Sequence, residues 1–76
     1  MKEILELIIK NLVEDTNSIS INEMKNDKNI TFQVKVAASE MGKVIGRQGR
    51  VAKSIRSIIK AMAIKEHIHV NVEFVD

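Results

Sequence analysis

The chain has 76 residues, of which 45% are hydrophobic and 29% are charged, a composition typical of one folded domain and too apolar for a disordered protein. It contains no cysteine, which excludes disulfides and thiolate chemistry, and so small a core leaves no room for a large active-site cleft. The first residues lack the apolar core of a signal peptide, and no apolar run reaches the ~18 residues of a membrane span, so we expect a cytoplasmic protein.

The first predicted element is an amphipathic helix over Lys2–Glu14. Its apolar side chains share one broad face, and Lys2, Glu6 and Lys10 are spaced at i, i+4. The apolar positions are Ile4, Leu5, Ile8, Leu12 and Val13. Residues 15–17, Asp-Thr-Asn, have the composition of a turn, so we expect the helix to stop there.

Two strands are predicted next. Residues 18–24 alternate only weakly, through Ile19 and Ile21, and indicate a short edge strand. Residues 25–29 form a polar cluster of the kind that joins antiparallel neighbours. The following strand is clearer, because Ile30, Phe32, Val34 and Val36 all face one way and polar residues face the other. This pattern predicts a sheet with one buried and one solvated face.

A short helix is predicted over Glu40–Ile45, with Ser39 as its N-cap, Glu40 in its first turn and Gly46 at its end. A long amphipathic helix is predicted over Arg50–Ala63, because its apolar residues fall within an arc of roughly 120° at about 100° per residue. The apolar side has Val51, Ala52, Ile55, Ile58, Ile59 and Met62, and the opposite side has Arg50, Lys53, Ser54, Arg56, Ser57 and Lys60.

The last predicted strand is the cleanest, with Ile68, Val70, Val72 and Phe74 on one face. Two helices separate it from the preceding strand, so a parallel pairing between these strands is feasible. The predicted fold class is therefore α+β, in the order helix, strand, strand, helix, helix, strand. We expect a three-stranded mixed sheet with helices packed on one face, forming a single domain over residues 1–76.

The charge of the chain is strongly polarised. Residues 43–60 hold six basic residues and no acidic one, whereas the rest of the chain carries a net charge of −4. This basic stretch includes Gly46 and Gly49, which permit a close backbone approach just before the long helix. A helix start with free N–H groups is a ready site for phosphate. The stretch therefore indicates a ligand with a phosphate backbone.

The run GKVIGRQGRVAKSIRSIIKA, residues 42–61, resembles the core of a K-homology (KH) domain, with its Gly-x-x-Gly loop at residues 46–49. The element order resembles the type II arrangement, and the whole chain is similar to the small bacterial single-KH proteins of the KhpA family. The resemblance implies single-stranded RNA binding, with the backbone of about four nucleotides clamped at the loop.

Carried over by position, the resemblance makes the loop the clamp and its apolar neighbours the walls of a groove for bases. The clamp residues are Gly46, Arg47, Gln48 and Gly49, and the groove residues are Val44, Ile45 and Val51. We expect Lys43, Arg50 and Lys53 to hold the RNA backbone together with Arg47 and Gln48. Arg56 and Lys60 lie further along the helix and could serve either solubility or a second strand of RNA.

Only two aromatic residues are present, Phe32 and Phe74, and both occupy inward positions of strands. Stacking platforms like those of RRM and OB domains are therefore not expected, and bases should rest on aliphatic side chains. The family resemblance further implies a homodimer or a heterodimer with a larger KH-containing protein. It also implies a role as an RNA chaperone or post-transcriptional regulator linked to cell shape and peptidoglycan homeostasis.

Other classes of function remain open. The two helices around the loop could form a helix-turn-helix that binds duplex DNA, or the basic face could be a solvated surface of a protein-interaction subunit. An enzyme is not expected, because Ser54 and Ser57 have no local acid and histidine partners. No cofactor is implied. His67 and His69 are better read as surface residues than as metal ligands, since no cysteine or third ligand is evident.

Overall fold

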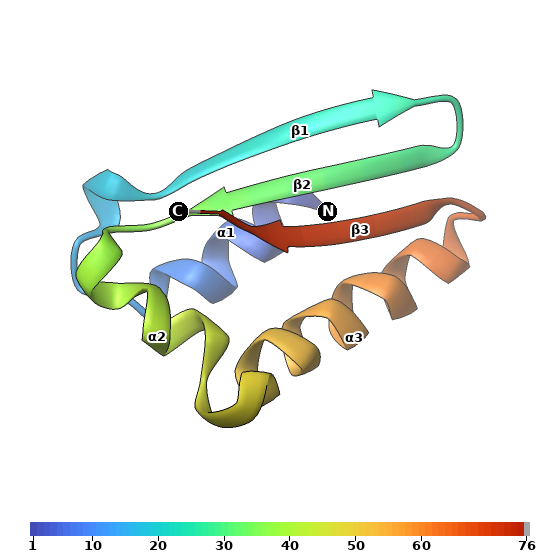
Figure 1. Cartoon of the computed structure of the whole chain (residues 1–76). Coiled ribbons are helices and arrows are strands. Elements are labelled where there is room, and N and C mark those ends of the chain that lie inside the picture. Colours follow the sequence, from blue (N-terminus) through green and yellow to red (C-terminus); the bar gives the residue numbers. More distant parts are fainter. Residues whose placement is uncertain (76) are drawn as a thin grey trace.

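Three strands form one mixed sheet, and the helices lie on one side of it (Figure 1). The computed structural model describes residues 1–75, so residue 76 of the predicted domain lies outside the described residues. The strands are β1 (Ser20–Asn26), β2 (Asn29–Lys35) and β3 (His69–Phe74). The helices are α1 (Lys2–Lys10), α2 (Met41–Ile45) and α3 (Arg50–Lys65), with 3₁₀ turns η1 (Thr16–Ser18), η2 (Ala38–Glu40) and η3 (Arg47–Gly49). The predicted α+β class and element order are confirmed.

The sheet has the order β1-β2-β3, with β2 in the centre. β1 pairs with β2 antiparallel, and β3 pairs with β2 parallel, as the two intervening helices predict. On the helix-facing side, Ile30, Phe32 and Val34 of β2 lie beside Val70 and Val72 of β3, and all five are buried. The opposite side is polar, so the alternation predicted for β2 and β3 is confirmed.

The hydrophobic core lies between this sheet face and the inner sides of α1 and α3. Leu5 and Ile9 of α1 and Ile59 of α3 are fully buried against the strands. Burying each such side chain contributes about 1.5–3 kcal/mol relative to leaving it exposed. Because the chain is short, these few residues supply much of its stability.

α1 ends at Lys10, four residues before the predicted end at Glu14. Leu12 and Val13 continue the apolar spacing and do pack on the core, but they lie beyond the last helical turn. Asn11 forms the C-cap, and its side-chain amide donates to the Leu7 carbonyl at 2.8 Å. The chain then leaves the helical path because the next free N–H groups, from Glu14 and Asp15, bind a carboxylate from another element.

The strand boundaries differ from the prediction by one or two residues. β1 runs to Asn26, since its pairing with β2 continues until Asn26 opposes Asn29. The predicted turn of five residues therefore shrinks to Asp27 and Lys28, with Asp27 at a positive φ of 56°. Most of β1 is exposed, which explains why its hydrophobic alternation is weak.

Three further details predicted for the helices are wrong. Ile4, which was assigned to the apolar face of the first helix, is 40% exposed, whereas Ile9, which was not assigned to it, is fully buried. Ser39 is not an N-cap, because it lies inside η2 and α2 begins at Met41 without a side-chain cap. Ile58 is not on the buried side of α3, since its side chain is 48% exposed. α3 runs alongside the edge strand β3 (Figure 1), and only a narrow stripe of the helix is buried. This stripe consists of Ala52, Ile55, Ile59 and Ala63.

The neighbouring isoleucines of α3 provide a direct test of this packing. We expect Ile59→Ala to lower the free energy of unfolding by about 2–5 kcal/mol, because it leaves a cavity at a fully buried position. Ile58→Ala makes the same chemical change at an exposed position and should stay within about 1 kcal/mol of the parent protein. Urea denaturation followed by circular dichroism measures both, and equal losses would contradict the observed orientation of α3.

Candidate nucleic-acid interface

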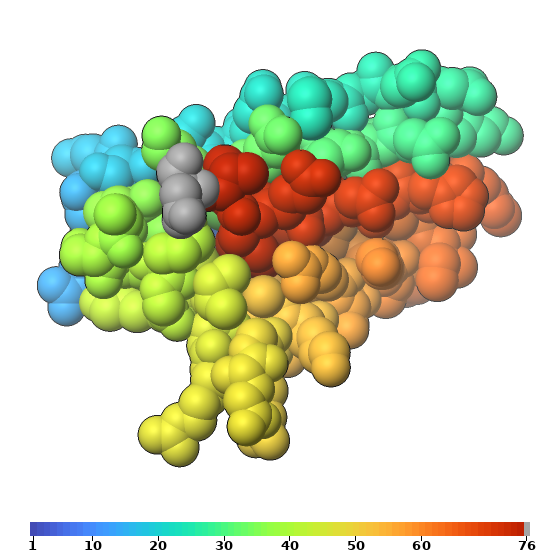
Figure 2. Space-filling model, in the orientation of Figure 1, coloured from blue at the N-terminus to red at the C-terminus, as the bar shows by residue number. Residues whose placement is uncertain are grey.

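The loop between α2 and α3 projects from the body of the protein, as the yellow segment of Figure 2 shows. Gly46 ends α2 with φ 75° and ψ 176°, a conformation that is essentially restricted to glycine. A Cβ at Gly46 would lie 2.8 Å from the Cβ and 2.9 Å from the backbone nitrogen of Val51. Gly46 is therefore required both by its backbone conformation and by the close approach of the start of α3.

The other loop residues turn the chain into α3. Gln48 adopts a left-handed conformation, φ 55° and ψ 27°, and Gly49 follows with φ 74° and ψ 15°. A left-handed non-glycine residue costs about 1–2 kcal/mol, so Gln48 is a strained residue at the tip of the loop. Arg47 and Gln48 are both exposed, as predicted for residues that project outward. A Cβ at Gly49 would meet nothing within 4 Å, so its role is conformational.

The start of α3 is open to an anion. Its N-cap is Gly49, which has no side chain to bind the free N–H groups, and its first turn contains no acidic residue. Arg50 and Lys53 are exposed on the first turns of this helix, and Arg47 precedes them in the loop. Within residues 1–75, none of these three side chains forms an ion pair. The region therefore combines a helix dipole with three uncompensated cations.

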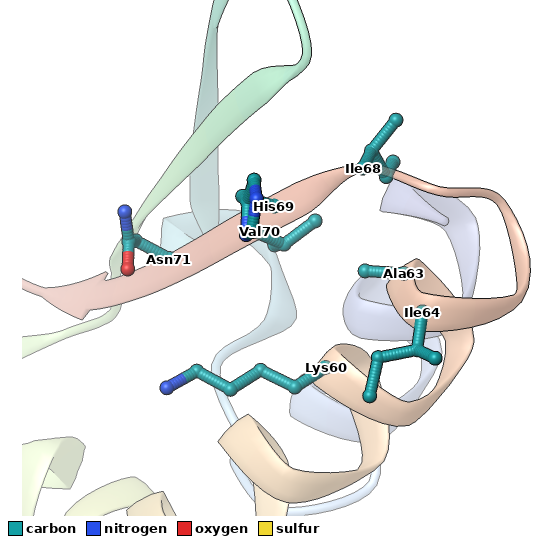
Figure 3. A pocket seen from close by; sticks show the side chains of 7 residues that line it. All are labelled: Lys60, Ala63, Ile64, Ile68, His69, Val70 and Asn71. Carbon is teal, nitrogen blue, oxygen red and sulfur yellow. The ribbon is translucent and has the colours of Figure 1, made fainter.

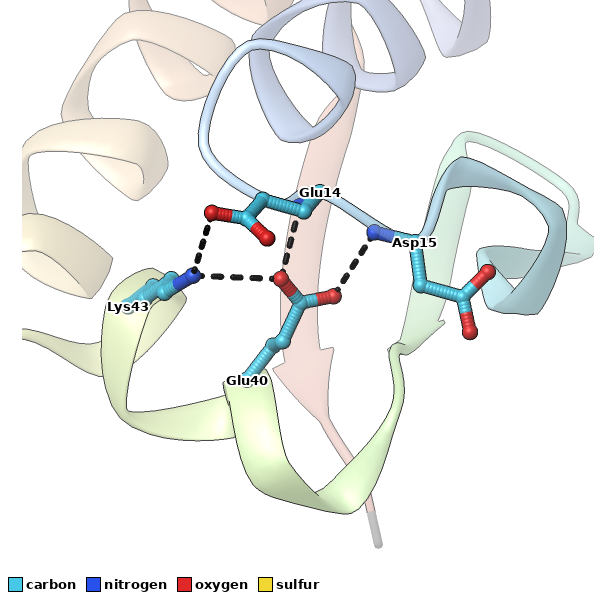
Figure 4. Close-up of polar contacts among 4 residues, drawn as sticks. All are labelled: Glu14, Asp15, Glu40 and Lys43. Atoms are coloured by element: carbon cyan, nitrogen blue, oxygen red, sulfur yellow. Dashed lines mark hydrogen bonds and ion pairs between the residues drawn. The ribbon is translucent and has the colours of Figure 1, made fainter.

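Lys43 is placed differently from the other predicted site cations. Its ammonium nitrogen lies 3.2 Å from Oε1 of Glu40 and 4.0 Å from Oε1 of Glu14 (Figure 4). Its side chain is still 47% exposed, but its charge is partly balanced inside the protein. Lys43 thus lies within α2, beside Glu40 and Glu14, whereas Arg47 and Gln48 lie in the loop that follows.

Glu40 is the only charged residue among residues 1–75 that is buried. Its carboxylate accepts hydrogen bonds from the backbone N–H of Glu14 at 2.6 Å and of Asp15 at 3.0 Å (Figure 4). These two hydrogen bonds, together with Lys43, hold the pKa of Glu40 below its ordinary value although burial opposes the shift. Glu40 therefore ties the start of α2 to the connection after α1. Sequence reasoning missed this role, since the partners are backbone groups 25 and 26 residues away.

Arg56 is turned back onto β3. Its Nε donates to the carbonyl oxygen of Val72 at 3.0 Å, and its guanidinium lies over the ring of Phe74, 5.4 Å from the ring centroid. Such a cation–π contact contributes about 0.5–1 kcal/mol at a partly exposed site. Arg56 thus links α3 to the edge strand, a role that neither of the two sequence-based interpretations of this residue included. The spacing of residues gave no signal for it.

The three apolar residues predicted to wall a base-binding groove are not equivalent. Val44 is fully buried and belongs to the core, so it supports the loop from beneath and has no surface to offer a base. Ile45 and Val51 are half-buried on either side of the loop and do present apolar surface. Any apolar contact at this site therefore falls to Ile45 and Val51.

His67 and His69 are exposed, and among residues 1–75 no group of three or more histidine, aspartate or glutamate side chains is arranged to hold a metal ion. None of the helices described is long and apolar enough to cross a membrane.

A three-stranded mixed sheet with this helix order, and a projecting Gly-x-x-Gly loop between α2 and α3, defines a type II KH domain. The chain belongs to the KhpA/KhpB KH-domain family, whose family model matches residues 2–74. The resemblance found in the loop sequence is thereby confirmed for nearly the whole chain.

Relatives from several bacteria match the chain from end to end. The RNA-binding protein KhpA of Clostridium perfringens is 47% identical over 75 residues, which cover 99% of this chain and 100% of that protein. RNA-binding protein KhpA of Borreliella burgdorferi is 35% identical over 97% of this chain and 90% of its own length. The corresponding protein of Chlamydia trachomatis is 33% identical over 100% of this chain and 97% of its own length.

Glycine-to-alanine substitutions at two positions test the geometry of the loop. We expect Gly46→Ala to lower the free energy of unfolding by about 1–3 kcal/mol, because alanine disfavours this backbone conformation and its Cβ would collide with Val51. Gly42→Ala is the matched control, since its Cβ would meet nothing within 4 Å and alanine favours a helix by about 0.5–1 kcal/mol. Chemical denaturation measures both, and a Gly46→Ala protein as stable as Gly42→Ala would contradict the loop geometry.

Acid denaturation tests the Glu40 anchor. A carboxyl group whose pKa is lower in the folded state stabilises the fold above its unfolded pKa of about 4.3, and this contribution is lost as pH falls through the folded value. We expect the parent protein to lose stability on acidification below about pH 5 more steeply than Glu40→Gln, which should be the less stable of the two at pH 7.

Glu66→Gln, at an exposed position after α3, should retain the steep profile of the parent protein. Urea midpoints measured from pH 7 to pH 3 give the three profiles. A Glu40→Gln profile that runs parallel to that of the parent protein would show that the carboxylate does not anchor the fold in this way.

Proposed function

We propose that this protein binds single-stranded RNA and holds the RNA backbone at the Gly46–Gly49 loop and the start of α3. The observation that carries the proposal is the projecting, positive-φ loop that opens directly onto an uncapped helix start with three uncompensated cations. The similarity to bacterial relatives that are named as RNA-binding proteins supports the same conclusion.

The proposed mechanism follows from the layout of the loop. The glycines let a sugar-phosphate backbone approach the main chain closely, and the free N–H groups at the start of α3 face the phosphate. Arg47, Gln48, Arg50 and Lys53 then donate to phosphate oxygens around the clamp. Bases on the apolar side rest on Ile45 and Val51, with Val44 packed beneath them. Lys43, within α2, adds to the positive electrostatic potential while it remains paired with Glu40.

Contacts of this kind recognise the backbone more than the bases. With about three phosphates neutralised, the logarithm of the binding constant should fall with the logarithm of the salt concentration with a slope of roughly −2. Little sequence preference is expected, because the loop presents few groups that could hydrogen-bond to base edges.

A single module with so few contacts binds weakly, and pairing with a second module would raise the affinity for one RNA. We therefore propose that the protein works in the cytoplasm as a homodimer or together with a larger KH-containing protein. Exposed Leu7 on α1 and Ile58 on α3 are available for protein contacts. A role as an RNA chaperone or post-transcriptional regulator, linked to cell shape and peptidoglycan homeostasis, is the family-based part of the proposal.

The structure gives less support to a duplex-DNA module. α2 has only five residues, and Arg56 is bound to β3 instead of projecting from α3 toward a groove. A protein-interaction subunit without nucleic-acid binding remains the alternative that the binding experiment must separate from the RNA proposal.

Fluorescence anisotropy with a short unstructured RNA, at two salt concentrations, tests the clamp. The double variant Arg47→Asp/Gln48→Asp should bind at least about tenfold more weakly than the parent protein, because it replaces two donors by carboxylates that repel phosphate. Its binding should also lose most of its dependence on salt.

The matched control is Lys28→Asp/Asn26→Asp, which makes the same change of charge in and beside the exposed β1–β2 turn. Circular dichroism confirms that each variant is folded. Equal binding by the loop variant and the control would place the RNA elsewhere. Absence of binding by the parent protein, with partner binding retained, would favour the protein-interaction alternative.

A further inference from the structure

β1 is an edge strand whose outer side has no neighbour in the described part of the chain. The sheet order is β1-β2-β3, and Figure 1 shows β1 along the upper rim of the molecule with no element beyond it. The strand has seven residues, and all of them are exposed except the half-buried Ile21. Such an edge presents a row of main-chain donors and acceptors that can pair with another strand.

The opposite edge of the sheet is less accessible, because α3 runs beside β3. Figure 3 shows the Lys60 and Ile64 side chains of this helix beside the beginning of β3, where they line a cavity together with strand residues. Further along, Nε of Arg56 donates to the Val72 carbonyl oxygen and occupies an acceptor of that edge. β1 is therefore the edge that is open to another strand.

The hydrogen bonds of β2 determine which groups of β1 face the open edge. The Val34 carbonyl accepts a hydrogen bond from Val75, so even-numbered residues of β2 direct their main-chain groups toward β3. The odd-numbered residues of β2 then bind β1, and their partners are the even-numbered residues of β1. The N–H and C=O groups of Ile21, Glu23 and Lys25 therefore point away from the sheet, to the open edge.

The sequence of β1 is symmetric about Met24 if acid and base are exchanged. Glu23 and Lys25 flank Met24 directly, and Asn22 and Asn26 flank it two positions away. Two copies of β1 that pair antiparallel, with Met24 opposite Met24, bring Glu23 of each copy opposite Lys25 of the other. Because the main-chain groups of these two residues point to the open edge, each such pair forms two main-chain hydrogen bonds in addition to its ion pair.

Charge disfavours the neighbouring registers. A shift by two residues in one direction sets Lys25 opposite Lys25 and Glu23 opposite Asp27, and a shift in the other direction sets Glu23 opposite Glu23. Like charges directly opposite each other destabilise a strand pair. Within residues 1–75 neither Glu23 nor Lys25 forms an ion pair, so both charges are available to a second strand.

We propose that two copies of the chain pair through this edge, with β1 antiparallel to β1 about Met24, and form one continuous sheet from the three strands of each copy. The inference rests on the homodimer named in the proposed function and assigns its surface and register. β1 and β3 lie on opposite edges, and α3 runs beside β3, so both Gly46–Gly49 loops remain free for RNA. One strand pair is a small interface, so the dimer should dissociate at micromolar concentrations.

Single cysteines test the register, because the chain has none of its own. In a non-hydrogen-bonded antiparallel pair the Cα atoms are about 4.5 Å apart, so Met24→Cys should form a covalent dimer when oxidised by glutathione disulfide. Asn22→Cys is the matched control on the same exposed face of β1. The two copies of position 22 are offset by about 13 Å along the strands, so this variant should stay uncrosslinked. Equal crosslinking of both variants would overturn the register.

Charge reversal tests the ion pairs. Glu23→Lys and Lys25→Glu each oppose like charges in a dimer of identical copies, so each should raise the dissociation constant at least about tenfold in sedimentation equilibrium. An equimolar mixture of the two variants restores both pairs and should dimerise as tightly as the parent protein. Both positions are exposed, and circular dichroism verifies that each variant is folded. Dimerisation that is unchanged in both single variants would overturn the assigned pairs.

The control on the helices is Ile58→Glu, which places a charge on the exposed side of α3 and should dimerise like the parent protein. A dimer that is lost in this variant but is insensitive to the β1 variants would place the contact on the helices and overturn the strand pairing. A parent protein that stays monomeric up to about 1 mM would overturn both the pairing and the proposed homodimer.

RNA binding at the loop is measured separately. None of the β1 variants should change the affinity for a short RNA, because β1 lies on the other side of the sheet from α3 and the loop. A parent protein that dimerises through β1 but does not bind RNA would overturn the clamp and support the strand pairing.

Discussion

The close approach of Gly46 to Val51 is the contact on which the candidate site depends. The chain must reverse direction between α2 and α3, and only a residue without a Cβ can take the required conformation so near to the first turn of α3. This reversal leaves the side chains of Arg47 and Gln48 exposed to solvent. It also leaves Gly49, which has no side chain, at the helix start, so the free N–H groups of α3 remain open.

The loop keeps its position only if α2, which precedes it, is fixed against the rest of the protein. The Glu40 carboxylate has this role. α2 has only five residues and cannot be stable through its own hydrogen bonds. Glu40 binds two backbone N–H groups that the end of α1 leaves without helical partners, and Val44 packs into the core directly behind the loop. A polar anchor and an apolar anchor on neighbouring turns thus fix α2 against the rest of the domain.

The basic residues divide into two groups with different tasks. Lys43 and Arg56 contact other groups of the protein: Lys43 joins α2 to the connection after α1, and Arg56 joins α3 to β3. Arg47, Arg50 and Lys53 form no ion pair among the described residues and face solvent around the loop, where Arg50 makes only a long hydrogen bond of 3.4 Å to the exposed Gln48 side chain. All six charges of the basic stretch therefore contribute to its electrostatic potential, but only some of these side chains are free to move toward a ligand.

The sequence by itself determined the order of the elements, the parallel pairing of β3, the position of the loop and the sign of its charge. These features depend on hydrophobic periodicity, on glycine spacing and on the number of residues between strands, which are all local properties of the chain. Tertiary structure alone decided that α1 stops at Lys10 and that Arg56 binds β3. It also decided that Val44, which was expected to line a groove, is buried, and that Ile58, which was expected to be buried, is exposed. Each of these outcomes depends on a group from a distant part of the chain, such as the Glu40 carboxylate or the Val72 carbonyl, whose position exists only after the helices have packed on the sheet.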